Sequence, residues 1–188
     1  MDKLPTDQSG HPFLNPPRLL HEAGLEPGQS VADLGCGAGY FILPAARTVG
    51  SRGVAYAVDV QQTALSSVRS RAAIYGLTNI QTVWSNVEQL GAARVVTDHS
   101  LDMVLLVQLL SQSKKHADIF REVDRIIKPG GKLVVVDWKP DAAGFGPARG
   151  LRVPLSTVEE MVRRHGFSAE QQLTASPYHY GVVYTKKR

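Results

Sequence analysis

Three glycines follow an aspartate in the segment VADLGCGAGYF, residues 31–41. Gly35, Gly37 and Gly39 alternate with other residues shortly after Asp33. Glycine is used where the backbone takes a positive φ or where a ligand must come close to the chain. Three glycines within five residues, directly after a strand-like run, therefore predict a loop that lines a ligand site.

Two common phosphate-binding loops fit this spacing poorly. A dinucleotide fingerprint, G-x-G-x-x-G, that started at Gly35 would need a glycine at position 40, which is Tyr40. A P-loop needs Lys and then Ser or Thr after its glycines, and no such pair follows here. The loop is therefore a poor match to a pyrophosphate or a triphosphate.

Two carboxylates suggest a different ligand. Asp33, at the end of the first expected strand, favours an ammonium group, and the start of the next helix favours a carboxylate. Asp59 lies twenty residues after Gly39, at the end of the second expected strand, and can accept hydrogen bonds from both hydroxyls of a ribose. S-adenosylmethionine, an amino acid joined to a nucleoside, combines these groups.

Strands and helices are expected to alternate along residues 18–138, which implies a parallel sheet with helices on both faces. The near-continuous apolar run LDMVLLV is typical of a strand buried on both faces. We predict strands at 30–34, 54–58, 80–84, 101–107 and 133–138, helices at 18–23, 40–49, 63–75 and 115–127, a short helix around 87–90, and a turn at 128–132.

The last part of the chain predicts an antiparallel pair. After a helix at 157–165, strands at 167–173 and 179–186 are joined by about five residues, too few for a parallel crossover. The predicted fold class is thus α/β, a doubly wound, seven-stranded, mostly parallel sheet with a C-terminal antiparallel hairpin. We expect one domain over residues 1–188, with an N-terminal arm and short helix at 1–23 and the core at 24–188.

Composition limits the class of protein. The 188 residues are 43% hydrophobic, enough for a substantial core, and hold no apolar run of about 18 residues and no secretion signal. The single cysteine, Cys36, excludes an internal disulfide, and the six histidines lack metal-ligand spacing. We therefore expect a cytoplasmic protein without a metal site. The formal charge of +4 is spread along the chain, so nucleic-acid binding is allowed but not required.

Five segments in this order resemble the class I S-adenosylmethionine-dependent methyltransferases, of the small ubiquinone/menaquinone-methyltransferase-like kind. They are VADLGCGAG, the VDV around Asp59, Ser85-Asn86-Val87, LDMVLLVQLL and IIKPGGKLVVVD. The resemblance covers about residues 13–138 and implies a Rossmann-like fold and S-adenosylmethionine as the methyl donor, with S-adenosylhomocysteine as the product.

The resemblance also implies a cofactor site at the ends of the first four strands. Asn86 stands where the family often has Asp, but its carbonyl oxygen can still pair with the adenine amino group. The implied residues are Asp33, Gly35 and Gly37 at the methionine end, Asp59 at the ribose, Val60 on the adenine, Asn86 and Val87 at its edge, and Val107 and Gln108 beside the methionine and the transferring methyl group.

The acceptor should bind in loops at the same end of the sheet, at 108–113, 138–154 and 175–179, with the arm at 11–15. His11 and His179 are the candidate general bases, and Arg149 or Arg152, in a loop expected to act as a lid, could meet an anionic acceptor. Because no added substrate domain is recognised, we favour a small-molecule acceptor. The sequence reveals neither its identity, nor the atom methylated, nor the oligomeric state.

Three other functions stay open from the sequence. A nucleic-acid or protein methyltransferase would use the basic surface, and its binding would depend on salt. A non-catalytic module would bind S-adenosylmethionine without turnover. A nicotinamide oxidoreductase would bind NAD(H), which the glycine spacing disfavours.

Overall fold

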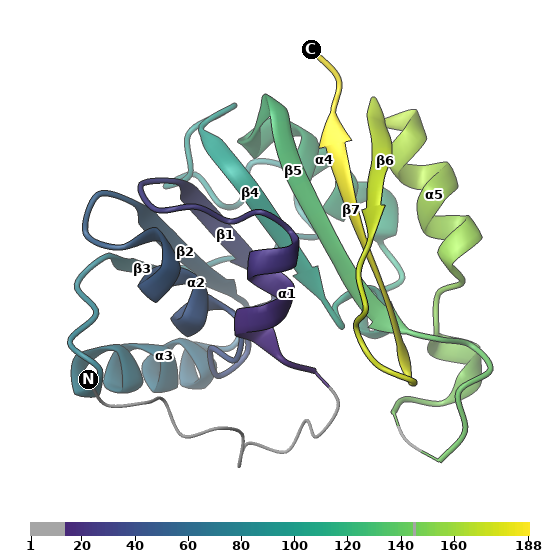
Figure 1. The fold of residues 1–188 in the computed structure, drawn as a ribbon, viewed down its shortest axis with the longest axis horizontal. Helices are drawn as coiled ribbons and strands as arrows, with labels where there is room; N and C mark the ends of the chain where they lie inside the picture. Colours follow the sequence, from purple (N-terminus) through teal and green to yellow (C-terminus); the bar gives the residue numbers. More distant parts are fainter. Residues whose placement is uncertain (1–13, 145) are drawn as a thin grey trace.

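The structure is a computed structural model that describes residues 14–144 and 146–188. Its centre is a seven-stranded sheet of order β3-β2-β1-β4-β5-β7-β6 (Figure 1). β1 to β5 pair in parallel, whereas β7 is antiparallel to both β5 and β6, so the predicted fold class is confirmed. The strands are β1 Ser30–Leu34, β2 Val54–Asp59, β3 Ile80–Trp84, β4 Leu101–Val107, β5 Ile127–Trp138, β6 Phe167–Gln172 and β7 His179–Lys186.

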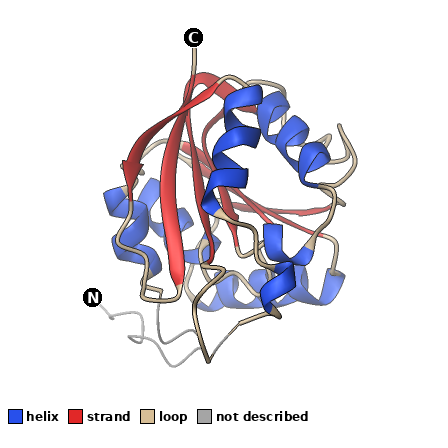
Figure 2. Ribbon diagram, turned by 90° about the vertical axis from the view of Figure 1, so that its right-hand side faces the viewer, coloured by secondary structure: helices blue, strands red, loops and turns tan. Residues whose placement is uncertain are grey.

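Helices cover both faces of the sheet (Figure 2). In β4, Met103 and Leu105 pack in one apolar cluster with the first three helices, while Val104 and Leu106 pack in a second cluster with the last two. Every second residue of a strand points to the same face, so this central strand is apolar on both faces, with Asp102 near its start as the exception. The helices are α1 Pro16–Glu22, α2 Ile42–Val49, α3 Gln62–Ile74, α4 His116–Ile126 and α5 Leu155–Arg164, with short 3₁₀ turns η1 Leu110–Gln112 and η2 Arg149–Leu151.

The turn predicted at 128–132 is wrong, because β5 begins at Ile127 and continues through this segment. Leu101 of β4 pairs with Ile127, but Met103 pairs with Lys132, so β5 carries extra residues as an irregularity in the ladder. Gly130 has φ +79°, which suits glycine, and a side chain on Gly131 would meet Ile127 Cγ1 at 2.7 Å. The glycines permit a bulged strand here.

The short helix predicted around 87–90 is also wrong, because this segment forms turns. Asn86 Oδ1 accepts a hydrogen bond from the Glu88 N–H at 3.0 Å, and the Asn86 carbonyl accepts one from Gln89 at 3.0 Å. An Asn side chain that accepts from the backbone two residues on stabilises a turn. The other predicted elements are present, and their ends differ by at most two residues from the prediction, except that the strand predicted at 133–138 begins six residues earlier, at Ile127.

The same edge of the sheet holds the ends of the parallel strands and the start of β7. Leu34, which precedes the glycine loop, pairs with Leu106 of β4. Val107 pairs with Val136 of β5, and the last residue of β5, Trp138, pairs with His179. We call this the carboxyl edge of the sheet. It brings together residues that are far apart in the sequence, from Leu34 to His179. Among the described residues, no helix has the length and apolar character needed to cross a membrane.

Replacing Glu122 with alanine should strongly destabilise the fold. Glu122 is 0% exposed, pairs with Arg125 at 2.6 Å and accepts the Gly91 N–H at 2.7 Å. Its loss leaves the Gly91 N–H without its acceptor and the Arg125 guanidinium with Asp98 as its remaining carboxylate partner, at a cost of about 3 kcal/mol. We expect the midpoint of thermal unfolding, followed by circular dichroism, to fall by roughly 10 °C.

The control for this variant is Glu160→Ala, which removes an exposed partner of Arg164 on α5. Exposed pairs contribute little, so its midpoint should stay within about 2 °C of the wild type. Equal midpoints for the two variants would contradict the assigned role of Glu122.

Candidate cofactor-binding and active site

The glycine loop lies across the end of β2. The N–H groups of Gly35 and Cys36 donate to the Val58 carbonyl at 2.8 and 3.1 Å. Gly35 and Gly37 have φ of +74° and +51°, values that favour glycine. A side chain on Gly35 would meet Leu109 Cδ1 at 2.8 Å, whereas a Cβ on Gly37 would meet no atom within 4 Å. The loop therefore leaves open space beside Gly37.

Asp33 is a buried carboxyl group below this loop, with 2% of its surface exposed. Burial, together with the charge of Asp59, raises the pKa of Asp33 to about 7, and a hydrogen bond with the Ile42 N–H at the start of α2 partly opposes the shift. A cation placed against Asp33 would favour its charged form. The electrostatics of the site thus suit an ammonium group.

Asp59 holds the loop in place as well as facing the site. Its Oδ2 accepts the Gly37 N–H at 2.9 Å, and its Oδ1 accepts the Gln61 N–H at 2.8 Å. A carboxylate offers about four acceptor positions, so both oxygens can still accept from a pair of hydroxyls. The sequence predicted that Asp59 could accept hydrogen bonds from a ribose, but it did not predict that Asp59 also holds the glycine loop.

Two exposed apolar side chains lie beside Asp59. Val60 is 59% exposed and Trp84, at the end of β3, is 66% exposed. The Trp84 Nε1–H donates to the Val60 carbonyl at 2.9 Å, which ties the two residues together. Large exposed apolar groups close to a polar site suit contact with a planar ring. Sequence reasoning missed Trp84, whose only signal was its place at the end of β3.

The loop after β3 adds polar atoms to the same region. Val87 is buried, and Asn86 is half-buried with its Oδ1 already accepting the Glu88 N–H. Ser85 donates its N–H to the Asp59 carbonyl at 3.1 Å, and its buried Oγ has no hydrogen-bond partner in the described part of the chain. An orphaned buried hydroxyl is costly unless a ligand or water satisfies it. The sequence pointed to the segment, but not to this atom.

Gln108 links β4 to the far strands of the sheet. Its backbone has φ +53°, which is strained for a residue other than glycine, and its N–H donates to the Val136 carbonyl at 2.8 Å. Its side-chain Nε2 lies 2.7 Å from Nε2 of His179. The turn η1, which follows Gln108, is held by Asp137 of β5. The buried Asp137 carboxylate accepts the N–H groups of Leu110 and Ser111.

His179 is 2% exposed and contacts groups from three segments. Its Nδ1 lies 2.8 Å from Ser176 Oγ, its Nε2 contacts Gln108, and its ring packs on Trp138 with centroids 4.1 Å apart. The structure thus brings Gln108 and His179 together, as the loop positions suggested. His11 lies outside the described residues.

The loop after β5 is tied down by Arg152. Its guanidinium donates to the carbonyls of Pro147 at 2.9 Å and of Lys139 at 3.0 Å, and lies 5.9 Å from the Trp138 ring. Gly146 has φ +92°, and a Cβ there would approach Trp138 to 2.5 Å. Arg152 therefore stabilises this loop. Arg149 is exposed on η2, so of the two arginines it is the one left to meet an anionic ligand.

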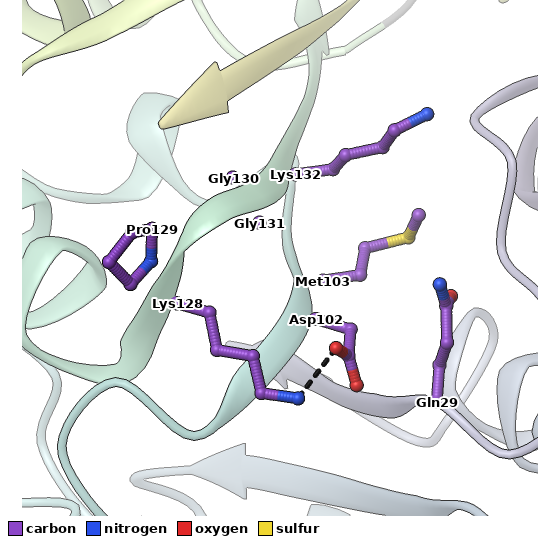
Figure 3. A pocket seen from close by; sticks show the side chains of 8 residues that line it. All are labelled: Gln29, Asp102, Met103, Lys128, Pro129, Gly130, Gly131 and Lys132. Atoms are coloured by element: carbon purple, nitrogen blue, oxygen red, sulfur yellow. Dashed lines mark hydrogen bonds and ion pairs between the residues drawn. The ribbon is translucent and has the colours of Figure 1, made fainter. Parts of the chain in front are cut away.

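A hollow of about 150 Å³ lies at the opposite edge of the sheet, beside the bulge of β5 (Figure 3). Asp102 there accepts the Ser30 N–H at 2.8 Å and pairs with Lys128 at 2.6 Å. Its carboxylate joins β1, β4 and β5, which indicates a structural role. The hollow is separate from the carboxyl edge.

The sheet order, the glycine loop after β1 and the carboxylate at the end of β2 define the architecture of Rossmann-like methyltransferases. The chain matches the family described as a methyltransferase domain over residues 25–174. It therefore belongs to this family, within the class I S-adenosylmethionine-dependent methyltransferases.

Relatives support this assignment. The chain is 28% identical to an arsenite methyltransferase of Halobacterium salinarum over 61% of this chain and 28% of the relative. It is 29% identical to a ubiquinone/menaquinone biosynthesis C-methyltransferase of Vibrio vulnificus over 62% of this chain and 44% of the relative. The matches thus span less than half of these relatives' own length.

One solved structure shows the same fold over nearly the whole chain. A S-adenosylmethionine-dependent methyltransferase from Aquifex aeolicus superimposes with a TM-score of 0.85, 24% identity, and coverage of 95% of this chain and 93% of that one. At this identity the likeness establishes the fold.

The residues at the carboxyl edge fit the methyl donor that the family implies. The open space at Gly37 can receive a ligand, a cation beside Asp33 would lower its raised pKa, and the Ser85 hydroxyl lacks a protein partner in the described residues. Each is a feature that an amino-acid group joined to a nucleoside would satisfy.

Proposed function

We propose that this protein transfers the methyl group of S-adenosylmethionine to a small organic molecule bound at the carboxyl edge of the sheet. The observation that carries the proposal is the pair Asp33 and Asp59, two neighbouring carboxylates around an open glycine loop. One suits the ammonium group of the donor and the other its ribose. The sulfonium donor supplies an electrophilic methyl group, so the protein chiefly aligns the acceptor and excludes water.

The proposed donor site uses the nine residues assigned from the sequence, together with Ser85 and Trp84. Gly35 and Gly37 let the chain approach the methionine end, and Val60 with Trp84 forms an apolar wall for the adenine. Gln108 would lie beside the methyl group, where β4 ends. The complete proposed set is Asp33, Gly35, Gly37, Asp59, Val60, Trp84, Ser85, Asn86, Val87, Val107 and Gln108.

An organic acceptor is favoured over arsenite, the substrate named for one relative. Soft ions prefer thiolate ligands. The chain has a single cysteine, Cys36, which is buried, and burial raises the pKa of its thiol. A neutral, buried thiol is a poor ligand. Compounds of the kind named for the other relative, quinone precursors, need no thiol.

The basic surface gives less support to a nucleic-acid acceptor. Several basic side chains are already paired with carboxylates, which spreads the positive charge rather than collecting it. The paired residues include Arg18, Lys115, Arg121, Arg125, Lys128, Lys132, Arg164 and Lys186.

Calorimetric titration tests the proposal. The protein should bind S-adenosylhomocysteine with one site per chain and should show no heat with NAD⁺ under the same conditions. With S-adenosylmethionine that carries a labelled methyl group, label should then pass to members of a small-molecule panel. Absence of S-adenosylhomocysteine binding would refute the proposal, and binding without transfer to any compound would favour the non-catalytic module.

A further inference from the structure

Helix α3 packs directly against the glycine loop. A Cβ on Gly39 would meet Val68 of α3 and Leu43 of α2, each at 3.1 Å, which is closer than ordinary van der Waals contact. Gly39 also has φ +92°, a value that favours glycine. The third glycine of the loop therefore permits the close approach of α3, which brings side chains of this helix within reach of the loop.

Arg71 makes use of this close approach. Residues three apart on an α-helix lie on the same side, so Arg71 follows Val68 toward the loop. Its Nη1–H donates to the Ala38 carbonyl at 3.0 Å, between residues 33 positions apart. In the described ranges 14–144 and 146–188, Arg71 pairs with no carboxylate. Its guanidinium therefore serves the loop and not an ion pair.

Two charged side chains hold the loop at neighbouring residues. Asp59, at the end of β2, accepts the Gly37 N–H at 2.9 Å, and Arg71 donates to the carbonyl of the next residue, Ala38. Hydrogen bonds with a charged partner are stronger than neutral ones. Because a glycine-rich segment has wide backbone freedom of its own, these two bonds restrict it to one conformation.

An ordered loop favours binding of the donor. Ordering a mobile segment costs conformational entropy, and a site that is ordered beforehand avoids this cost when the ligand arrives. In the proposed donor site, Gly37 lies at the methionine end, whereas Val60 and Trp84 lie at the adenine. Ala38 directly follows Gly37, so the order that Arg71 imposes on the loop benefits chiefly the amino-acid half of the donor.

We propose that Arg71 is a positioning residue of the donor site and holds the glycine loop in the conformation that receives the amino-acid half of S-adenosylmethionine. The inference rests on the proposed function. Arg71 acts through the Ala38 carbonyl and does not itself have to touch the donor. The side chain is half-buried at the surface of α3, so it can be replaced without disturbing the core.

Arg69 offers a matched control on the same helix. Side chains two residues apart on a helix do not face the same way. Arg69 donates to Thr82 Oγ1 of β3 at 3.0 Å and to Ser66 Oγ at 2.8 Å, so it lies toward β3 and not toward the loop. Replacing either arginine removes the same charge from α3, and a difference between the two variants reports on the loop contact.

Calorimetric titrations with S-adenosylhomocysteine and with adenosine test the proposal. Arg71→Met keeps a long side chain but cannot donate a hydrogen bond. It should bind S-adenosylhomocysteine about fivefold more weakly than the wild type, the effect of losing one hydrogen bond that orders the loop. Its affinity for adenosine, which lacks the amino-acid half, should be unchanged. Arg69→Met should bind both ligands as the wild type does.

Amide hydrogen exchange measures the order of the loop without any ligand. The segment 35–41 should exchange about fivefold faster in Arg71→Met than in the wild type, because the loop opens more often once the bond to Ala38 is lost. Arg69→Met should exchange as the wild type does. Saturating S-adenosylhomocysteine should slow exchange in every variant, since the bound ligand orders the loop in turn.

These measurements distinguish failure of the inference from failure of the proposed function. A wild-type protein that does not bind S-adenosylhomocysteine refutes the proposed function. If the wild type binds it, three results refute the role of Arg71. They are an unchanged affinity of Arg71→Met for S-adenosylhomocysteine, an equal loss of affinity for adenosine, which indicates general destabilisation, and unchanged exchange of the segment 35–41.

Discussion

Replacing Asp59 with alanine is expected to weaken binding of S-adenosylhomocysteine about 100-fold. Two hydrogen bonds from ribose hydroxyls to an ionised carboxylate contribute together about 3 kcal/mol, which is roughly two orders of magnitude in affinity. The Gly37 and Gln61 N–H groups also lose their acceptor, so the glycine loop becomes less well ordered. Isothermal titration calorimetry measures the loss directly.

A ligand comparison separates the two effects of Asp59. Wild-type protein should prefer S-adenosylhomocysteine to its 2′-deoxy analogue about tenfold, and Asp59→Asn should reduce this preference because an amide has one acceptor oxygen. A general collapse of the loop would weaken both ligands equally. Asp102→Asn, at the opposite edge of the sheet, serves as the control and should leave both affinities unchanged. A preference that survives in Asp59→Asn would exclude contact with the ribose 2′-hydroxyl.

The variant Asp33→Asn is expected to be more stable than the wild type at pH 8 and to bind S-adenosylhomocysteine poorly. Burial and Asp59 raise the pKa of Asp33 from 3.8 to about 7 in the folded protein. A raised pKa means that the unfolded chain ionises first, so the stability contributed by Asp33 is complete below pH 3.8 and is lost as the pH rises through about 7. A neutral amide of nearly the same shape avoids this loss.

The difference in thermal midpoint between Asp33→Asn and the wild type should therefore depend on pH. At pH 8 the thermal midpoint of Asp33→Asn should exceed that of the wild type by about 5 °C or more, and the gap should narrow toward pH 4. Asp118→Asn, which alters a surface pair with Arg121 on α4, should show no such trend. Saturating S-adenosylhomocysteine should reverse the order at pH 8, since only the carboxylate can pair with its ammonium group. A gap that does not vary with pH would contradict a raised pKa for Asp33.

Local patterns were sufficient to predict most of the fold. The apolar run 101–107 and the short link 174–178 gave a central parallel strand and a terminal hairpin, both of which are present. The helix predicted at 87–90 and the turn predicted at 128–132 were wrong because hydrogen-bond partners decided the backbone conformation of these segments. Asn86 accepts the Glu88 N–H in a turn, and residues 128–131 bulge between Ile127 and Lys132, which both pair with β4. Neither contact can be recognised from a short stretch of the sequence.

The sequence by itself determined the sheet, the glycine loop and the two carboxylates at the ends of β1 and β2, because these depend on residue type and on neighbours along the chain. Only the tertiary structure decided what those groups touch. The Asp59–Gly37 bond and the Gln108–His179 contact join residues 22 and 71 positions apart. Such contacts follow from the order of strands in the sheet, which places only β5 between the end of β4 and the start of β7, and from side-chain packing. The burial that raises the pKa of Asp33 arises in the same way, since it requires the whole core to be assembled.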